Sequence, residues 1–570
     1  MSDRIDAQSV DNKRRHLLAL MGGGGVASMA GCLGIFDDGG DDQDTLPADE
    51  IPMDGEFTAS VGANPSQFDP TPINDAPSNA ISSLQYETLV EADFNNESFN
   101  AVLAEDWEQE EETTYRFDLR EGIQFHSGGE LTADDVEHSV LRMRGTVQDA
   151  TVSTWYEDSE VVDDYTIRFE LSQPHAPLLT DIAGIPIVSA DETKQDISGE
   201  DVEKDNNFEE NSVGTGPFVI ENFEPEDRVE LSRYDDYWFE ETEDMPGMAP
   251  WETVTFRVVV EQTSQQEALR SGELDMIDNA NPVELSTLDS EANTSVVTTT
   301  GLGFDFLSYP VNNPPYTNSK FRRGITRLIP TSDVIEAVWS GYAEEQAGPI
   351  SPGLGAFYDE DFEQMLLDEY VGEDPEAARQ LLDEAFEEED IEKPFDVSLI
   401  TNENRTRERW MEVIQQTLDD TEYFNASLDI RPFDALVPFL ISGDAAESQD
   451  IVGIGWTGGS DPDGHVAQLL ESRYHVPDGF NWILYENDEV DQLIKDARQE
   501  TDQEERKQLY EDLSELLAQE VPYAFMWTSE QYDVVRTDGV VNWQAYPNSS
   551  LRYVGLYRPY HGQVSYRPQS

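Results

Sequence analysis

Residues 453–458, GIGWTG, carry the pattern G-x-G-x-x-G, which surrounds a bound pyrophosphate in dinucleotide-binding proteins. Such a site requires a strand that passes directly into a helix, because the phosphates bind at the N-terminus of that helix. Residues 451–452 fit the end of a strand, but 459–464, GSDPDG, continue as a loop before a helix can begin. We therefore expect a loop at this place and no cofactor.

Residues typical of catalysis give little support for an enzyme. The chain has 120 Asp and Glu residues, so some carboxylates will lie at glycosidase spacing by chance alone. It lacks the G-x-S-x-G, H-E-x-x-H and P-loop patterns, and it has only 7 His. His126 has no second His nearby, so we expect it to make a structural hydrogen bond and expect no metal site. A secreted hydrolase acting on peptides or sugars stays as an alternative.

The length and charge of the chain indicate a large acidic protein with more than one hydrophobic core. The 570 residues are 38% hydrophobic, and single cores stop growing at roughly 250–300 residues. The formal charge of -86 is spread along the chain, while 10 Trp, 22 Tyr and 25 Phe supply enough apolar surface for folding. The Debye length falls to about 3 Å at 1 M salt, so this composition indicates a halophilic protein. Nucleic acid is an unsuitable partner for such a charge.

The N-terminal residues are interpreted as an export signal. Arg14 and Arg15 precede a short apolar run at 17–30, which is shorter than the about 20 apolar residues of a stable membrane span. This arrangement resembles a twin-arginine signal. Met29-Ala30-Gly31-Cys32 resembles a lipobox, which implies lipid attachment at Cys32. Cys32 is the only cysteine, so a disulfide within the monomer is excluded.

The elements that must position any site alternate between strands and helices. Residues 57–61 fit a strand that runs into the loop 64–70, and 80–89 fit a helix. Residues 218–223 and 229–234 fit a β-hairpin after the turn at 213–217. A helix capped by Thr132 follows two short strands, and 497–522 read as one long helix that stops at proline.

These segments resemble the peptide-binding class of extracytoplasmic solute-binding proteins of ABC importers, family 5. The resemblance rests on GTGPF at 214–218 with the hairpin and YW after it, and on YETL at 86–89. Its most specific part is LREGIQFHSGGELTADDVEHSV at 119–140. It implies an α/β, two-lobed periplasmic-binding-protein-like fold (type II, cluster C) with mixed sheets, a hinge and an interlobe cleft.

The resemblance also implies the division of the chain. We expect a lipoprotein signal at 1–31, an acidic tether at 32–52 and lobe I at 53–303 with an inserted subdomain at about 86–185. Lobe II is expected at 304–527, and 528–570 return to lobe I.

The expected ligand-binding residues lie on loops that face the cleft in this family. They are Asn64, Gln67, Tyr86, Thr215, Asn313, Trp456, Asp461 and Asp463. In the family's peptide binders an Asp three residues after the Trp pairs with the ligand ammonium; that position here is Gly459, and Asp461 and Asp463 are the nearest acids. The arginine that holds the carboxylate of dipeptides corresponds to Thr401, with Arg405, Arg407 and Arg409 close by.

The expected function is that of a monomeric receptor, held by lipid at Cys32 on the extracytoplasmic face of the membrane. It would capture di- or oligopeptides and deliver them to importer permease subunits. Another polar solute such as an oligosaccharide, or sensing without transport, remains an alternative.

The charge predicts a salt-dependent fold. Dialysis from multimolar to about 0.1 M salt lengthens the Debye length to ~10 Å, so repulsion between surface carboxylates should lower the melting temperature. Thermal unfolding followed by circular dichroism at both salt concentrations measures this. An unchanged melting temperature would reject the halophilic interpretation.

Overall fold

The computed structural model describes residues 46–71, 73, 75–146, 148–193, 213–278, 280–477 and 479–569, within one compact unit, Thr45–Ser570. The export and lipid positions Arg14, Arg15 and Cys32 lie outside the described residues. The end of the expected tether packs on the protein, because Ala48 and Ile51 are buried and Ile51 joins the core around β1. Among the described helices, none is long and apolar enough to cross a membrane.

Lobe I is built on one part of a twelve-stranded sheet. β1 is parallel to β10 and β11, and β10, β9 and β8 continue as an antiparallel meander. The hairpin expected after GTGPF is thereby confirmed as β8 and β9. Alternate residues of β1, Phe57, Ala59 and Val61, face the core. The elements of lobe I are β1 (Gly55–Val61), α2 (Ala76–Ser82), β8 (Phe218–Glu224), β9 (Arg228–Arg233), β10 (Trp251–Val258), α7 (Gln262–Ser271), β11 (Met276–Ile277), α8 (Pro282–Asp289), β12 (Thr294–Thr300), η7 (Ser549–Leu556), β19 (Tyr557–Arg558) and β20 (Gln563–Val564).

A subdomain inserted in lobe I has its own sheet and core. Its antiparallel sheet has the order β4-β5-β7-β6, and α3 packs on β6 and β7. The expected cap of α3 is present as a capping box of Thr132 and Asp135. The elements are β2 (Val90–Ala92), β3 (Phe99–Ala101), β4 (Ala104–Glu111), β5 (Thr114–Leu119), α3 (Ala133–Leu141), α4 (Ala150–Ser153), β6 (Tyr156–Asp163), β7 (Thr166–Leu171), α5 (Leu178–Ala183) and α6 (Ala190–Thr193).

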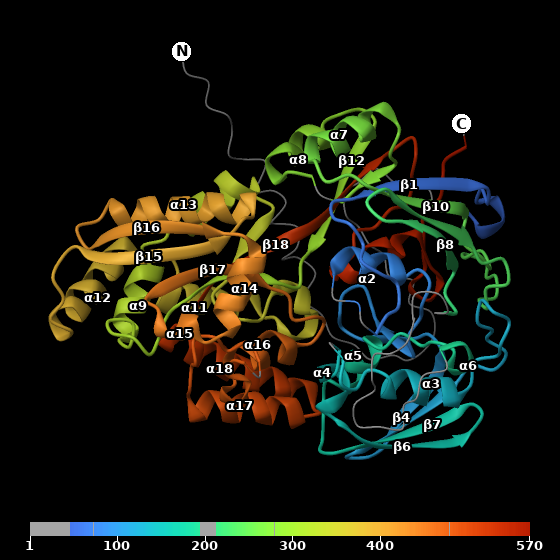
Figure 1. Cartoon of the computed structure of the whole chain (residues 1–570), viewed down its shortest axis with the longest axis horizontal. Helices are drawn as coiled ribbons and strands as arrows, with labels where there is room; N and C mark the ends of the chain where they lie inside the picture. The colour runs from blue at the N-terminus through green and yellow to red at the C-terminus, as the bar shows by residue number, and fades with distance from the viewer. Residues whose placement is uncertain are drawn as a thin grey trace, which may run out of the picture. The chain divides into compact units, whose positions relative to one another are not determined.

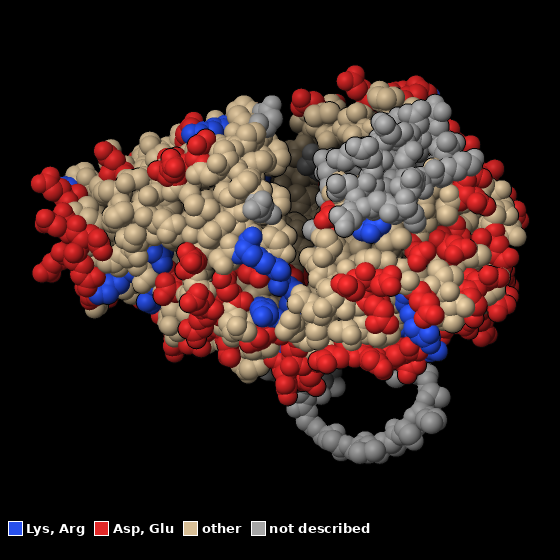
Figure 2. Space-filling model, turned by 60° about the horizontal axis from the view of Figure 1, so that its bottom comes forward, with Lys and Arg blue, Asp and Glu red and all other residues tan. Residues whose placement is uncertain are grey.

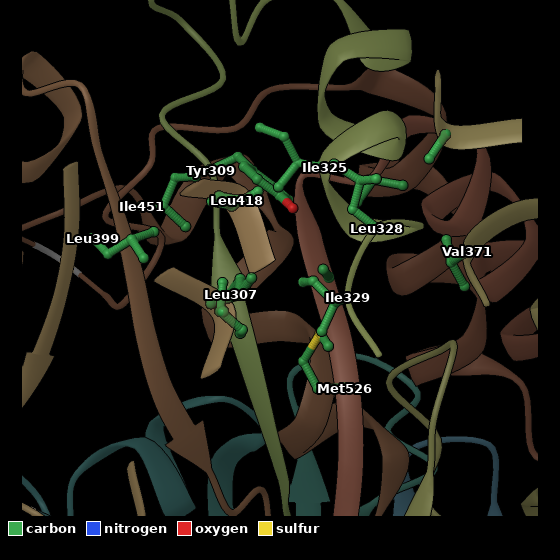
Figure 3. Packing of buried hydrophobic residues seen from close by; sticks show 14 of the residues in the cluster. Leu307, Tyr309, Ile325, Leu328, Ile329, Val371, Leu399, Leu418, Ile451 and Met526 are labelled. Carbon is green, nitrogen blue, oxygen red and sulfur yellow. The ribbon is translucent and has the colours of Figure 1, made fainter. Parts of the chain in front are cut away.

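Lobe II places a mixed sheet between two hydrophobic clusters. Neighbouring residues of the central strands β13, β17 and β18 enter opposite clusters, as Leu307 and Phe306 of β13 do. Figure 3 shows part of the first cluster, in which Leu307, Ile329 and Met526 come from different segments. The elements are β13 (Phe304–Ser308), α9 (Ser319–Thr326), α10 (Thr331–Val334), β14 (Ala343–Glu345), α11 (Glu360–Leu366), α12 (Pro375–Glu388), β15 (Phe395–Asn402), α13 (Arg405–Asp419), β16 (Phe424–Arg431), α14 (Phe433–Ile441), α15 (Asp444–Glu447), β17 (Asp450–Trp456), α16 (Pro462–Leu470), α17 (Asp488–Gln499) and α18 (Gln503–Glu520).

One long strand joins the two lobes (Figure 1). β18 (Tyr523–Arg536) pairs through its first residues with β13 of lobe II. Its second half pairs with β12 and β11 of lobe I. The expected two-lobed α/β architecture with mixed sheets is confirmed, while the expected lobe boundaries stay a working division of the chain.

The expected single helix over 497–522 is wrong. The chain forms α17 and α18 with a break between them, because the Asp502 side chain caps α18 by accepting from the amides of Glu504 and Glu505. An N-cap residue requires non-helical backbone, so it ends the continuous helix at this point.

The surface charge agrees with the even distribution of acids in the sequence. Figure 2 shows patches of Asp and Glu scattered over the visible face and densest along its lower edge, with Lys and Arg gathered at a few places and a hollow near the centre whose visible wall is mostly of other residues. No group of three or more His, Cys, Asp or Glu residues in the described part of the chain has a geometry suited to a metal ion.

Candidate ligand-binding cleft

A cavity of about 330 Å³ opens where β13, β17 and β18 meet the segment at 547–549. Carboxyl ends of strands and their following loops are the usual place for ligands in α/β sheets. Neutral polar groups make up much of its wall. The lining residues are Leu302, Gly303, Phe304, Asp305, Trp339, Asn404, Thr406, Arg407, Gly455, Trp456, Thr457, Ser529, Gln531, Tyr532, Pro547 and Ser549.

Trp456 is the predicted site residue that lines this cleft. It ends β17, its Nε1 donates to the carbonyl of Gly464 at 2.9 Å, and its ring meets that of Phe480 with centroids 5.4 Å apart. These contacts fix the indole, so it offers a rigid apolar wall beside the neutral polar groups.

The glycines of the G-x-G-x-x-G pattern have packing roles. Gly453 and Gly455 lie within β17, and the following helix α16 begins only at Pro462, after a loop. A side chain at Gly453 would collide with Trp410 and Met411. One at Gly455 would lie 2.6 Å from Arg407, so this glycine leaves room for the guanidinium.

Asp305 and Arg407 are the charged groups among the described residues of the cleft wall. Asp305 Oδ1 lies 3.4 Å from Arg407 Nε, and Asp305 Oδ2 accepts from Trp527 Nε1 at 3.1 Å. Arg407 Nη1 also donates to Asn402 Oδ1 at 3.0 Å. Of the three arginines near Thr401, Arg407 therefore faces the cleft. Asp305 was missed, although an acid between Phe304 and Phe306 in a core strand is a signal for a special role.

Tyr86 and Thr215 lie in lobe I, away from this cavity. Thr215 is fully buried, and its hydroxyl donates to Glu87 Oε2 at 2.9 Å. Tyr237 and Trp238 donate to the same carboxylate at 2.6 and 2.8 Å. Burial raises the pKa of Glu87 despite these donors. Tyr86 lines a second cavity, of about 240 Å³, which is called the lobe I cavity here.

Asn64, Gln67 and Asn313 are not among the residues that line either cavity. Asn64 accepts from the amide of Glu226 at 2.6 Å, which ties its loop to the β8–β9 turn. The backbone N–H of Gln67 donates to Ser78 Oγ at 3.4 Å. Asn313 Nδ2 donates to the carbonyls of Ala446 and Ser448. These contacts indicate roles in holding loops.

Asp461 and Asp463 are engaged by arginines of the neighbouring helices. Asp461 is buried and receives both Arg506 Nη1 and Nη2 at 2.7 Å, while its Oδ1 also caps α16. Burial opposes the charge, but Arg506 lowers the pKa of Asp461. Asp463 receives Arg498 Nε at 3.0 Å with both carboxylate oxygens. Neither charge is free to hold a ligand ammonium in this arrangement.

The structural interpretation of His126 is confirmed. Its Nε2 lies 2.8 Å from the carbonyl of Gly216, and its ring packs on Tyr234 with centroids 4.7 Å apart. The histidine thus holds the glycine turn before β8 against the subdomain.

We predict that Asp461→Asn destabilises the protein by about 3–5 kcal/mol, because it leaves the buried Arg506 without a counter-charge. Denaturant unfolding at constant high salt measures the free energy. The matched control is Asp429→Asn, which removes an exposed carboxylate paired with Arg431 and should change stability by under about 1 kcal/mol. Equal stability of Asp461→Asn and wild type would contradict the structural role.

Comparison with known proteins identifies a family and individual relatives. Residues 98–474 match the model of the bacterial extracellular solute-binding proteins, family 5. The chain is 26% identical to the dipeptide-binding protein of Escherichia coli over 507 residues, covering 84% of this chain and 89% of the relative. It is also 26% identical to heme-binding protein A of Haemophilus influenzae over 493 residues, covering 82% and 86%.

Solved structures share the fold. The oligopeptide-binding protein AppA of Bacillus subtilis, in complex with a nonapeptide, superposes with a TM-score of 0.72 at 21% identity, covering 91% of this chain and 100% of that one. The periplasmic binding protein DppA of Helicobacter pylori, in complex with the peptide STSA, gives a TM-score of 0.72 at 23% identity and covers 91% and 99%. With the family match spanning more than half of the chain, this protein belongs to the family 5 extracellular solute-binding proteins.

Proposed function

We propose that this protein captures peptides outside the cell and delivers them to the permease subunits of an ABC importer. The observation that carries the peptide assignment is the composition of the cleft wall. Neutral donors and acceptors such as Asn404, Thr406, Thr457 and Gln531 stand beside aromatic surfaces, with one carboxylate and one guanidinium among the described lining residues. A peptide main chain offers alternating N–H and C=O groups, which such a wall can bind with little regard to side chains.

Relatives supply independent support for this ligand class. Those named for peptide ligands include the dipeptide-binding protein of Escherichia coli and the nonapeptide complex from Bacillus subtilis. The family consists of binding proteins, and we propose that this chain likewise performs no catalysis. Peptide recovered intact by mass spectrometry after incubation would agree with that.

Capture would work through closure of the lobes. Asn96 Nδ2 of the subdomain donates to the carbonyl of Ser460 in lobe II at 2.7 Å. The amide of Ala176 donates to the carbonyl of Arg498 at 2.8 Å. Both acceptors adjoin the carboxylate–arginine pairs described above. A ligand that contacts both lobes would shift the population toward the form with these contacts, which the permease would recognise.

The ligand ends would be held unequally. Arg407 can donate to a peptide carbonyl or terminal carboxylate at the cleft wall. The carboxylate of the cleft wall, Asp305, is already engaged by Arg407 and Trp527, and Asp461, which does not line the cleft, is engaged by Arg506. We therefore infer that the ligand ammonium has no dedicated partner.

We predict that N-acetylation of a bound peptide weakens affinity by less than about tenfold, or about 1.4 kcal/mol, because no free carboxylate awaits the ammonium. Calorimetric titration with tetraalanine, free and N-acetylated, measures the difference. Asp429→Asn serves as the control for removal of a distant carboxylate. A loss of a hundredfold or more on acetylation, abolished in Asp305→Asn, would instead assign Asp305 as the anchor of the ammonium.

We propose that the protein is located at the extracytoplasmic face of the cell membrane, where a lipid attached to Cys32 holds it. Replacing Arg14 and Arg15 together by Lys should retain precursor in the cytoplasm, because a twin-arginine signal requires both side chains. Cys32→Ser should release soluble protein into the medium. Cell fractionation with immunoblotting distinguishes the products. Normal lipid-modified protein from both variants would contradict the proposed export signal and the lipid attachment at Cys32.

A further inference from the structure

Gln531 reaches the cleft from the lobe I side. Closure over a ligand needs a contact from each lobe, and Trp456 and Arg407 both come from lobe II. Gln531 lines the cleft from the second half of β18, where it pairs with Thr299 of β12 in lobe I. Alternate residues of a strand share a face, and Ser529, two residues earlier, lines the same cleft. This face of β18 therefore extends the cleft wall from lobe II into lobe I.

Arg552 fixes the orientation of the Gln531 amide. Arg552 Nη2 donates to Gln531 Oε1 at 3.4 Å. A guanidinium carries only donors, so the amide oxygen must face it and the amide nitrogen must face away. A Cβ atom at Gly301 would lie 3.3 Å from Gln531 Nε2, which places this nitrogen beside Gly301. Leu302 and Gly303 follow directly and line the cleft, so the nitrogen end of the amide lies at the cleft wall.

The guanidinium of Arg552 is itself held at three nitrogens. Its Nε lies 3.1 Å from Asp533 Oδ1, and its Nη1 donates to the carbonyl of Asp278 at 3.0 Å. Asp533 is 1% exposed, and its Oδ2 accepts from Trp543 Nε1 at 2.9 Å. Because the guanidinium is planar, Arg552 cannot turn away from Gln531 without losing a contact to Asp533 or Asp278.

The Nε2 group of Gln531 is a donor that a ligand can reach. No atom of the described residues accepts a hydrogen bond from it, and it is not among their buried polar atoms that lack a partner. The side chain is half-buried, so its nitrogen is open to solvent or to a bound molecule. Such a donor can bind a ligand carbonyl, whereas a ligand ammonium carries only donors and finds no partner there.

We propose that Gln531 Nε2 donates to a main-chain carbonyl oxygen of the captured peptide, and that Arg552 is the positioning residue that holds the amide in this orientation. This proposal rests on the proposed function, because it requires a peptide in the cleft. Arg407 from lobe II and Gln531 from lobe I then donate to the same ligand, which is the two-lobe contact that favours the closed form.

Calorimetric titration of the full chain with tetraalanine at high salt tests the donor. Gln531→Met keeps the length of the side chain and removes the donor, so it should weaken binding about fivefold to tenfold, as expected for one hydrogen bond between neutral groups. Gln531→Ala gives a second measurement of this loss. Gln508→Met is the matched control, because Gln508 is an exposed glutamine of α18 outside the cleft wall, and it should keep the wild-type affinity. Thermal melting of each variant checks folding.

The ligand side of the hydrogen bond can be changed as well. Three tetraalanines are prepared, each with a thiocarbonyl in place of one peptide carbonyl, because sulfur is a weaker acceptor than oxygen. One of the three should bind wild type more weakly than tetraalanine does, and this difference should disappear in Gln531→Met. A glutamine that only supported Arg552 would produce no such dependence on a ligand atom.

Arg552→Lys tests the positioning role. Lysine keeps a positive charge beside Asp533 but lacks the fork that reaches Asp533 and Gln531 together, so the affinity for tetraalanine should fall. In the Gln531→Met background the same change should alter the affinity by less than about twofold, because the amide that Arg552 positions is gone.

The opposite results are distinct from one another. Wild-type affinity in both Gln531→Met and Gln531→Ala would overturn the donor and leave the proposed function intact, and so would a loss that is the same for tetraalanine and all three thiocarbonyl peptides. An Arg552→Lys variant that binds like wild type, or that weakens binding equally in both backgrounds, would overturn the positioning role. Wild-type protein that does not bind tetraalanine would overturn both the peptide function and this donor.

Discussion

The backbone pairing of β18 is the interaction on which both lobes depend. Its first residues form hydrogen bonds with β13 in lobe II, and its second half pairs with β12 and β11 in lobe I. Trp527 lies near the change of partner, is fully buried, and packs edge-on against Trp410 at 5.2 Å. Its indole holds Asp305, so the strand that joins the lobes also positions the charged pair of the cleft.

Buried arginines give this acidic protein much of its internal order. Few basic residues are available, 34 against 120 acids, yet Arg142, Arg498 and Arg506 are buried beside carboxylates. Arg142 holds Asp69 at 3.0 Å and thereby fixes the loop that follows β1. Salt screens exposed charges far more than buried pairs, so these contacts keep their strength under conditions that relieve surface repulsion. Removing one partner leaves an uncompensated charge, which makes each pair a sensitive point of the fold.

The cleft and the lobe I cavity share one segment but differ in chemistry. The cleft presents Trp456, Asp305 and Arg407 to a ligand that lies across strand ends. The lobe I cavity is lined by Arg558, by the carboxylates of Glu87 and Glu91 and by neutral side chains such as Ser82. The neutral polar groups of the cleft are suited to main-chain groups, which they can bind without selection of sequence.

Local patterns in the sequence were enough to predict several strands and a capped helix. Alternation of apolar residues, N-caps and glycine turns each depend on residues that are close together in the chain. They therefore predicted β1, the β8–β9 hairpin, the cap of α3 and the hydrogen bond of His126, and they drew attention to Trp456, which lines the cleft. The long-range pairs required the tertiary structure. Asp461 and Arg506 lie 45 residues apart, Asp305 and Arg407 102 apart, and Thr215 and Glu87 128 apart. Whether a carboxylate faces a ligand or an internal arginine depends on which distant chain segment packs against it, and only the folded chain decides that.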